Sequence, residues 1–180
     1  MRVWVGVVLP KKIFNEVLKI QKEIAKKYKT YYSLGSNLGP HFTITHQENV
    51  NERNLKKIEK IVEEISEKTR PFKINIKGIR RFYKNRVIYA KVIKSKELNG
   101  LHKKLSYRLV KFGKIRLLRL FTPHITLAYK DITKENYRAA FKEFKNKEIS
   151  YEFELNKIHI GKARPEGRIK VFKSFKLKFK

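Results

Sequence analysis

Two short segments of this 180-residue chain repeat one phrase. The first reads GPHFTITH over residues 39–46, and the second reads FTPHITLAY over residues 121–129. Each places a histidine directly after a proline and a threonine two positions after the histidine. A lone histidine is more often structural than catalytic, but the chain has only five histidines, so two in the same setting indicate a shared role.

The repeated residue types suit phosphodiester chemistry. Alternate residues of a strand face the same side, so His41 shares a face with Thr43, and His124 with Thr126. Displacement at phosphorus needs one proton taken from the attacking oxygen and another given to the leaving oxygen, and imidazoles titrate in the right range for both. Threonine hydroxyls can donate to the non-bridging phosphate oxygens. The sequence shows no clustered acidic ligand set, so we expect no metal and no cofactor.

We assign no catalytic role to the other three histidines. His46 is expected in the opposite pleat phase from His41, and His102 lies beside the leucine stripe of a helix. His159 lies in a strand without a threonine two places on.

Hydrophobic periodicity predicts alternating strands and helices that would position these motifs. The expected strands are residues 2–9, 40–45, 71–79, 86–93, 123–129, 149–163 and 167–179, with a basic turn at 80–86 and a Pro-Glu-Gly turn at 165–167. The expected helices carry apolar stripes at Ile13, Val17, Ile20 and Ile24, at Leu55, Ile58, Ile61, Val62 and Ile65, at Leu98, Leu101, Leu105 and Leu109, and along residues 133–144. Asn51 or Asn54 is expected to cap the second helix, Gly113 to end the third and Thr133 to open the fourth. Each half therefore reads strand, helix, histidine strand, helix, strand.

Composition limits the class of protein. Hydrophobic residues make up 41% of the chain, enough for a core, and the length suits one domain over residues 1–180. The chain has no cysteine, which excludes disulfides and a cysteine nucleophile and fits a cytoplasmic protein. The apolar run near the N-terminus is too short to span a bilayer, and we expect it to form a buried strand.

The charge favours an anionic partner. Lys and Arg number 45 against 16 Asp and Glu, a net charge of +29, which attracts polyanions such as RNA. A solvated, lysine-rich surface is the alternative explanation for many of these lysines. A membrane-surface protein would need a basic helix with bulky apolar anchors, and these helices have ordinary core stripes, so no membrane partner is expected.

At these residues the sequence resembles the 2H phosphoesterase superfamily, whose signature is two His-x-Thr-x motifs, and specifically its LigT-like branch of RNA 2′,3′-cyclic phosphodiesterases, also called 2′-5′ RNA ligases. The likeness covers the N-terminal strand MRVWVGVVLP, HFTI, the RFYKNRVIYAKV hairpin, FTPHITLAY and the final strand pair around RPEG. The approach YYSLGSNLGPH departs from the approach typical of LigT-like proteins, which leaves the subfamily open.

The resemblance implies a bilobal α+β fold, with two pseudo-twofold-related lobes that each have an antiparallel sheet and outer helices, and with the histidine strands facing a central cleft. It implies that His41 and His124 are catalytic and that Thr43 and Thr126 bind phosphate. The implied reaction opens a 2′,3′-cyclic phosphate on RNA to a 2′-phosphate, with reversible 2′-5′ ligation in some members. We assign His124 as the base and His41 as the acid.

Further residues are candidates for substrate binding by a monomer that acts on RNA ends, such as those of tRNA fragments. Basic side chains can hold phosphates, and aromatic side chains can stack on bases. The candidates are Arg80, Arg81, Phe82, Tyr83, Tyr129, Arg164 and Arg168. Two alternatives stay open, namely a non-catalytic basic RNA-binding protein and a 2H enzyme that acts on another cyclic phosphate or phosphodiester.

Overall fold

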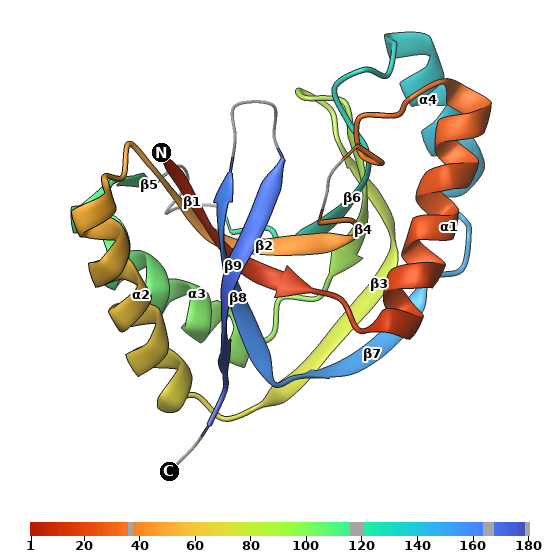
Figure 1. Ribbon diagram of the computed structural model, residues 1–180. Helices are drawn as coiled ribbons and strands as arrows, with labels where there is room; N and C mark the ends of the chain where they lie inside the picture. Colours follow the sequence, from red (N-terminus) through yellow and green to blue (C-terminus); the bar gives the residue numbers. More distant parts are fainter. Residues whose placement is uncertain (36–37, 116–120, 164–167, 179–180) are drawn as a thin grey trace.

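The computed structural model describes residues 1–35, 38–115, 121–163 and 168–178 of the protein (Figure 1). The strands are β1 (Arg2–Val8), β2 (His41–Glu48), β3 (Phe72–Phe82), β4 (Val87–Val92), β5 (Lys114–Ile115), β6 (His124–Ala128), β7 (Ser150–Leu155), β8 (Lys157–Ala163) and β9 (Ile169–Lys176). The helices are α1 (Lys11–Tyr28), α2 (Glu52–Glu67), α3 (Lys96–Leu109), a 3₁₀ turn at Val110–Phe112, and α4 (Lys134–Phe144).

The strands form one antiparallel sheet in the order β7-β3-β4-β6-β2-β1-β8-β9, with β5 beside β2. We call β2, β1, β8 and β9 lobe A, and β6, β4, β3 and β7 lobe B. The lobes meet where β6 lies beside β2, through the residue pair Phe42 and Ile125. Each lobe therefore has its histidine strand innermost, and the predicted bilobal α+β fold is confirmed.

Two of the four helices described, α1 and α3, pack on the lobe opposite to the strand that precedes them. Helix α1 contacts β6, and α4 contacts β3 and β4, so both cover lobe B (Figure 1). Helix α2 contacts β8 and β9, and α3 contacts β2, so both cover lobe A. Since α1 follows a strand of lobe A but packs on lobe B, the lobes do not coincide with the two sequence halves that the repeated pattern suggested.

The apolar stripes form the core as predicted. Ile13, Val17, Ile20 and Ile24 are buried on α1, and the expected stripes of α2 and α3 are buried too. Asn51 caps α2 by accepting a hydrogen bond from the Asn54 amide at 2.8 Å. Thr133 caps α4 in the same way, because its side chain accepts from the Asn136 amide at 3.2 Å.

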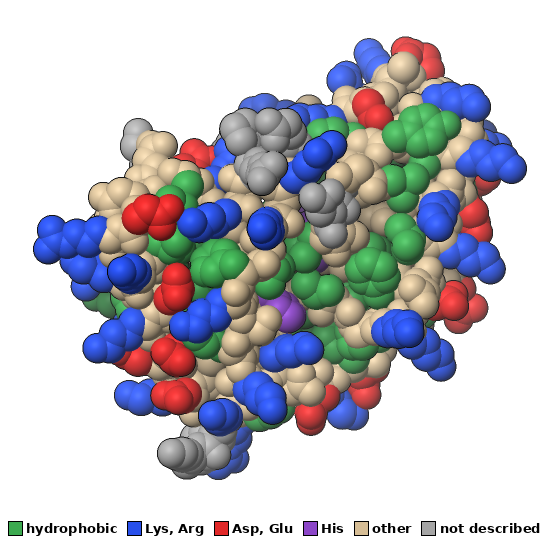
Figure 2. Space-filling view, in the orientation of Figure 1, with side chains coloured by type: hydrophobic (Ala, Val, Ile, Leu, Met, Phe, Trp, Pro, Cys, Tyr) green, Lys and Arg blue, Asp and Glu red, His purple; other side chains and the backbone are tan. Residues whose placement is uncertain are grey.

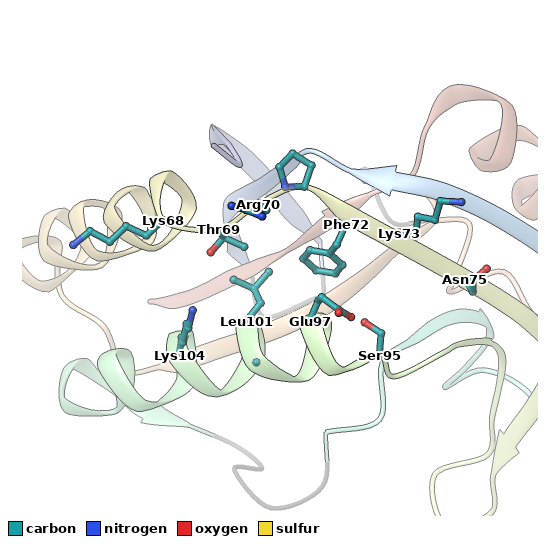
Figure 3. A pocket seen from close by; sticks show the side chains of 12 residues that line it. Lys68, Thr69, Arg70, Phe72, Lys73, Asn75, Ser95, Glu97, Leu101 and Lys104 are labelled. Atoms are coloured by element: carbon teal, nitrogen blue, oxygen red, sulfur yellow. The ribbon is translucent and has the colours of Figure 1, made fainter. Parts of the chain in front are cut away.

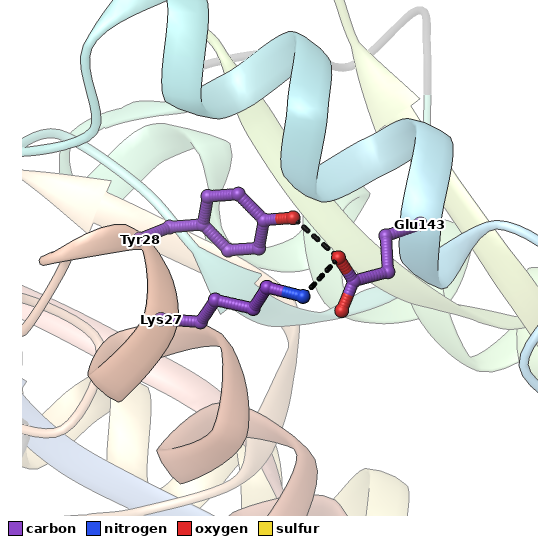
Figure 4. Close-up of polar contacts among 3 residues, drawn as sticks. All are labelled: Lys27, Tyr28 and Glu143. Atoms are coloured by element: carbon purple, nitrogen blue, oxygen red, sulfur yellow. Dashed lines mark hydrogen bonds and ion pairs between the residues drawn. The ribbon is translucent and has the colours of Figure 1, made fainter.

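The two helices of lobe B are linked through Glu143. Its Oε2 accepts from the hydroxyl of Tyr28 and from Nζ of Lys27, both at 2.6 Å (Figure 4). Burial, together with the hydrogen bond to this carboxylate, raises the pKa of Tyr28 to about 12. Tyr28 is therefore a neutral donor that joins α1 to α4.

Three predicted boundaries, two of strands and one of a helix, were wrong. The expected strand 149–163 divides at Asn156 into β7, which pairs with β3, and β8, which pairs with β1. Strand β3 continues through residues 80–82, which were expected in a turn. Helix α3 ends at Leu109, before the expected stop at Gly113, and a 3₁₀ turn fills the interval.

A bulge in β2 shifts the pleat. Val5 pairs with Thr45 and Gly6 pairs with Thr43, so Ile44 is an extra residue on β2. The imidazole of His102 donates from Nδ1 to the Ile44 carbonyl at 2.8 Å, which satisfies a buried acceptor. The alternation of side chains between the two faces of the sheet therefore shifts by one residue at Ile44.

Candidate active site

The pair of Phe42 and Ile125 sets the two motifs against each other. Both side chains are fully buried, so their neighbours along the strands face the opposite side of the sheet. In an antiparallel pair with this register, His41 lies opposite Thr126 and His124 lies opposite Thr43. One face of the sheet thus presents two imidazoles and two hydroxyls, which we call the motif face. Figure 2 shows histidine atoms near the middle of one face of the molecule, among hydrophobic side chains and with Lys and Arg around them.

The two imidazoles are oriented in the same way. Nδ1 of His41 bonds the Gly39 carbonyl at 2.8 Å, and Nδ1 of His124 bonds the Thr122 carbonyl at 2.8 Å. Because a carbonyl only accepts, each Nδ1 carries the proton, and the lone pair of the neutral ring is on Nε2. In both motifs the accepting residue directly precedes the proline, so the two histidines are oriented by equivalent carbonyls.

Gly39 can hold its carbonyl in this position because it is a glycine. Its φ is +62°, and a Cβ would lie 2.3 Å from the ring of Phe14. An L side chain at this position would be strained and would clash with α1. The carbonyl that fixes the tautomer of His41 therefore depends on glycine.

Trp4 of β1 joins the first motif. Its indole Nε1 donates to the Thr43 hydroxyl at 2.9 Å, and its ring lies edge-on to His41 with centroids 5.5 Å apart. The indole is only 2% exposed. Sequence reasoning missed this residue because the contact spans 39 positions of the chain.

Two aromatic residues of lobe B surround His124. Phe82 of β3 and Tyr89 of β4 stack on each other with centroids 4.4 Å apart. Their rings lie 5.1 Å and 5.3 Å from the imidazole of His124. Phe82 was a candidate for substrate binding, and the structure places it against a motif histidine, whereas Tyr89 was not predicted.

Both motif histidines have lowered pKa values. Burial disfavours the imidazolium and lowers the pKa of His41 and of His124 from 6.5, although the hydrogen bonds to Gly39 and Thr122 oppose this effect. Charge on His124 lowers the pKa of His41 further, so the two rings lie close enough to repel when both are protonated. Protonation of one ring therefore disfavours protonation of the other.

A lysine missed in the sequence lies beside the second motif. Lys91 pairs with His124 across β4 and β6, and paired residues share a face, so Lys91 lies on the motif face. Its side chain is exposed. A lysine therefore lies on the motif face one strand away from His124, and the alternation of β4 is the signal that could have identified it.

The adjacent arginines of β3 face opposite sides. Arg80 pairs with Tyr89, which contacts His124, so Arg80 belongs to the motif face. Arg81 pairs with the buried Ile88, and its guanidinium lies 4.2 Å from the ring centroid of Phe141 on α4. The structure therefore separates two candidates that the sequence grouped in one basic turn.

The remaining substrate candidates make no hydrogen bond or ring contact with a motif residue in the described part of the chain, or lie outside it. Arg81 also donates to the hydroxyl of Tyr83, which is 71% exposed. Tyr129 follows β6 and lies edge-on to Tyr32 with centroids 5.7 Å apart. Arg168 is exposed just before β9, and Arg164 lies outside the described residues.

The bulge corrects one prediction about the other histidines. His46 pairs with Trp4, beyond the extra residue Ile44, and so lies on the same face as His41 rather than in the opposite phase. His159 pairs with Gly6, and its Nδ1 lies 2.7 Å from the Ser174 hydroxyl. His102 is buried, donates a hydrogen bond to the Ile44 carbonyl at the bulge and stacks on Phe121.

A separate pocket of about 660 Å³ opens between the end of α2, the start of β3 and the start of α3 (Figure 3). Its rim includes Lys68, Arg70 and Lys104, and its apolar lining includes Phe72 and Leu101. None of the motif residues lines it, so it is distinct from the motif face.

Across the described ranges, no group of three or more His, Cys, Asp or Glu residues is placed to hold a metal ion. Within those same ranges, no helix is long and apolar enough to cross a membrane.

Two lobes whose innermost strands each present a His-x-Thr motif on a shared face define a two-histidine phosphoesterase fold. The model of the 2′-5′ RNA ligase superfamily matches residues 9–165, which include both motifs, and the chain belongs to this superfamily. The 2H, LigT-like relationship expected from the sequence is thus confirmed, and with it a phosphoesterase or ligase class of enzyme.

Individual relatives agree with this assignment. A Geobacillus kaustophilus protein named as a phosphoesterase is 27% identical over 151 residues, covering 83% of each chain. The crystal structure of TT0787 of Thermus thermophilus matches with a TM-score of 0.76 at 17% identity, covering 100% of both chains. E. coli LigT complexed with 3′-AMP matches with a TM-score of 0.69 at 16% identity, covering 98% of this chain and 97% of that one. These structural likenesses establish the fold.

Proposed function

We propose that the protein is a metal-independent RNA 2′,3′-cyclic phosphodiesterase that opens the cyclic phosphate to a 2′-phosphate. The observation that carries the proposal is the pairing of Phe42 with Ile125, which brings two His-x-Thr motifs onto one face with each histidine opposite the threonine of the other motif. In-line displacement at phosphorus needs a base beside the attacking oxygen and an acid beside the leaving oxygen. A phosphate bound between the two imidazoles would have one of each.

In the proposed reaction, Nε2 of His124 takes a proton from a water molecule as its oxygen attacks phosphorus. The bond from phosphorus to the 3′ oxygen breaks, and protonated His41 gives its Nε2 proton to that oxygen. The Thr43 and Thr126 hydroxyls donate to the non-bridging oxygens, where negative charge is held in the transition state. With a 5′ hydroxyl in place of water, the same proton transfers would form a bond from phosphorus to the 5′ oxygen as the bond to the 3′ oxygen breaks, which gives the 2′-5′ ligation expected of some superfamily members.

Two features of lobe B, together with the net charge of the chain, support RNA as the substrate. Arg80 and Lys91 place cations on the motif face beside His124 and Tyr89. Phe82 and Tyr89 place aromatic rings there too. Cations that bind phosphates together with aromatic rings that stack on bases are typical of single-stranded RNA sites, and the net charge of +29 attracts the polyanion. LigT has been crystallised with 3′-AMP, NADP+ and ATP, which agrees with a nucleotide-binding cleft in this fold.

The test is incubation of the protein, in excess chelator, with a short RNA that ends in a 2′,3′-cyclic phosphate. We expect conversion to a 2′-phosphate, and its loss in His41→Ala and in His124→Ala. His46→Ala is the matched control, since it removes an imidazole from the same strand and face outside the motif, and it should retain turnover.

The outcomes separate this proposal from the alternatives. Tight RNA binding without hydrolysis would favour a basic RNA-binding protein. Hydrolysis of another cyclic phosphate in preference to the RNA end would retain the two-histidine mechanism and reject the substrate. Turnover that survives in both histidine variants would reject the mechanism.

A further inference from the structure

Thr43 and Thr126 occupy equivalent places in the two motifs but have different surroundings. The Thr43 hydroxyl accepts a hydrogen bond from the indole of Trp4 at 2.9 Å. The Thr126 hydroxyl makes no side-chain hydrogen bond with any other described residue. Since the motifs are otherwise matched, this difference identifies Trp4 as an addition to the first motif alone.

The indole donates only, so it fixes which way the Thr43 hydroxyl points. A hydroxyl has one proton and two lone pairs, and the indole N–H occupies one lone pair of Thr43. The hydroxyl proton must then point away from Trp4, where it is available to an acceptor on the motif face. A threonine without this partner would rotate freely and would lose entropy on binding an anion.

Two glycines hold the indole in place. A Cβ at Gly6 would lie 2.3 Å from Cζ2 of Trp4 and 2.4 Å from the Phe42 carbonyl. Gly161 pairs with Trp4 across β1 and β8, and a Cβ there would lie 3.3 Å from Cε3 of the indole. The indole therefore occupies space that a side chain at either position would fill. Thr43 pairs with Gly6 and Trp4 pairs with His46, so the indole reaches Thr43 across the bulge at Ile44.

We propose that Trp4 is a positioning residue that presets Thr43 as a donor to the phosphate of the substrate. Trp4 is 2% exposed and does not reach the substrate itself, so it acts through Thr43. The same indole lies edge-on to His41, and thus it holds the acid–base histidine and the phosphate donor of one motif against a single rigid ring. The proposal rests on the proposed function for its phosphate substrate.

The direct test replaces Trp4 with β-(3-benzothienyl)alanine, which keeps the bicyclic shape and lacks the N–H. Trp4 is the only tryptophan in the chain, so the replacement changes one position. We expect kcat on the cyclic-phosphate RNA to fall about tenfold, the effect of one lost neutral hydrogen bond. Trp4→Phe, which removes the donor and part of the ring, should lower kcat at least as much.

The control is the same replacement in Thr43→Val, which has no hydroxyl to orient. There the benzothienyl analogue should cause no further loss of kcat, and the coupling between the two positions would account for the whole effect. An equal loss in both backgrounds, or no loss in the parent, would overturn the proposal and leave Trp4 a packing residue.

A second readout separates this inference from the proposed function. Inorganic phosphate should change the fluorescence of Trp4 when it binds to Thr43, and calorimetry should show weaker phosphate binding in the benzothienyl protein but not in its Thr43→Val counterpart. If the parent protein binds phosphate with this coupling but opens no cyclic phosphate, the role of Trp4 stands and the assigned substrate is wrong. If phosphate binding shows no coupling between the two positions, the role of Trp4 is rejected whatever the substrate.

Discussion

Phe42 and Ile125 face each other across β2 and β6, and through this pair the sheets of the two lobes are continuous. Both side chains are fully buried, and each is flanked in sequence by the histidine and the threonine of its motif. A slip of one residue in either strand would turn the imidazole and hydroxyl of that motif into the core. The burial of two apolar residues thus keeps four polar groups on one face.

The two histidines can be told apart with a substrate whose 3′ bridging oxygen is replaced by sulfur. A thiolate leaves without help from an acid, because its pKa is far below that of an alcohol. We expect the sulfur substrate to restore most of the activity of His41→Ala and none of that of His124→Ala, measured by single-turnover kinetics. Restoration of the His124 variant instead would reverse the assignment of acid and base.

The dependence of kcat/KM on pH should be displaced toward acid. One imidazole must be protonated and the other neutral, and burial disfavours the protonated form of both, which lowers their pKa values from 6.5. The acid therefore loses its proton at a lower pH than an ordinary histidine. We expect a bell-shaped profile whose basic limb has a pKa below 6.5, and a basic limb at or above pH 7 would contradict this environment.

Arg80 and Arg81 form a matched pair for testing the RNA surface. Arg80→Ala removes a cation from the motif face and should weaken RNA binding about tenfold, with a smaller salt dependence. Arg81→Ala removes a contact with Phe141 of α4 and should lower the melting temperature while leaving RNA affinity unchanged. Filter binding at several salt concentrations checks the first effect, and equal losses of affinity would show that the two faces are not distinguished.

His102 should stabilise the bulge at Ile44, which follows Thr43 on β2. His102→Phe keeps the stacking on Phe121 and leaves the buried Ile44 carbonyl without its donor, so the free energy of unfolding should fall by about 1–3 kcal/mol. Denaturant unfolding measures this, with His102→Gln as the variant that keeps an N–H donor.

The same residue predicts a pH effect on stability. Burial lowers the pKa of His102 in the folded protein, so the unfolded chain binds this proton more readily. Stability contributed by the neutral ring is present above pH 6.5 and is lost as the pH falls below it. We expect His102→Phe to lose less stability than the parent between pH 7 and pH 5. If the free energy of unfolding of the two proteins changed with pH in parallel, His102 would not be the source of the effect.

The sequence predicted what depends on local pattern. The stripe on α1, the caps at Asn51 and Thr133 and the two histidine strands follow from periodicity and hydrogen-bonding residues, which act over a few positions. The break at Asn156 was missed because no Gly or Pro marks it. A signal was present, since Leu155 and Ile158 are both buried at a spacing of three, which a single strand does not allow.

The parts of the site that were missed depend on contacts between distant strands. Trp4 meets Thr43 only because β1 pairs with β2, and no property of MRVWVGVV alone indicates that partner. Lys91 meets His124 through the pairing of β4 with β6. Arg80 and Arg81 were grouped because they are adjacent, whereas the strand assigns them to opposite faces.

The central claim is that His41 and His124 act together on one phosphate, and a double-mutant cycle tests it most directly. Single-turnover rates on RNA with a 2′,3′-cyclic phosphate, in chelator, would be compared for the parent, His41→Ala, His124→Ala and the double variant. Residues that act as a unit are strongly non-additive, so we predict a double variant no slower than the slower single variant. Losses that simply multiply, or a single variant with full activity, would contradict a shared two-histidine site.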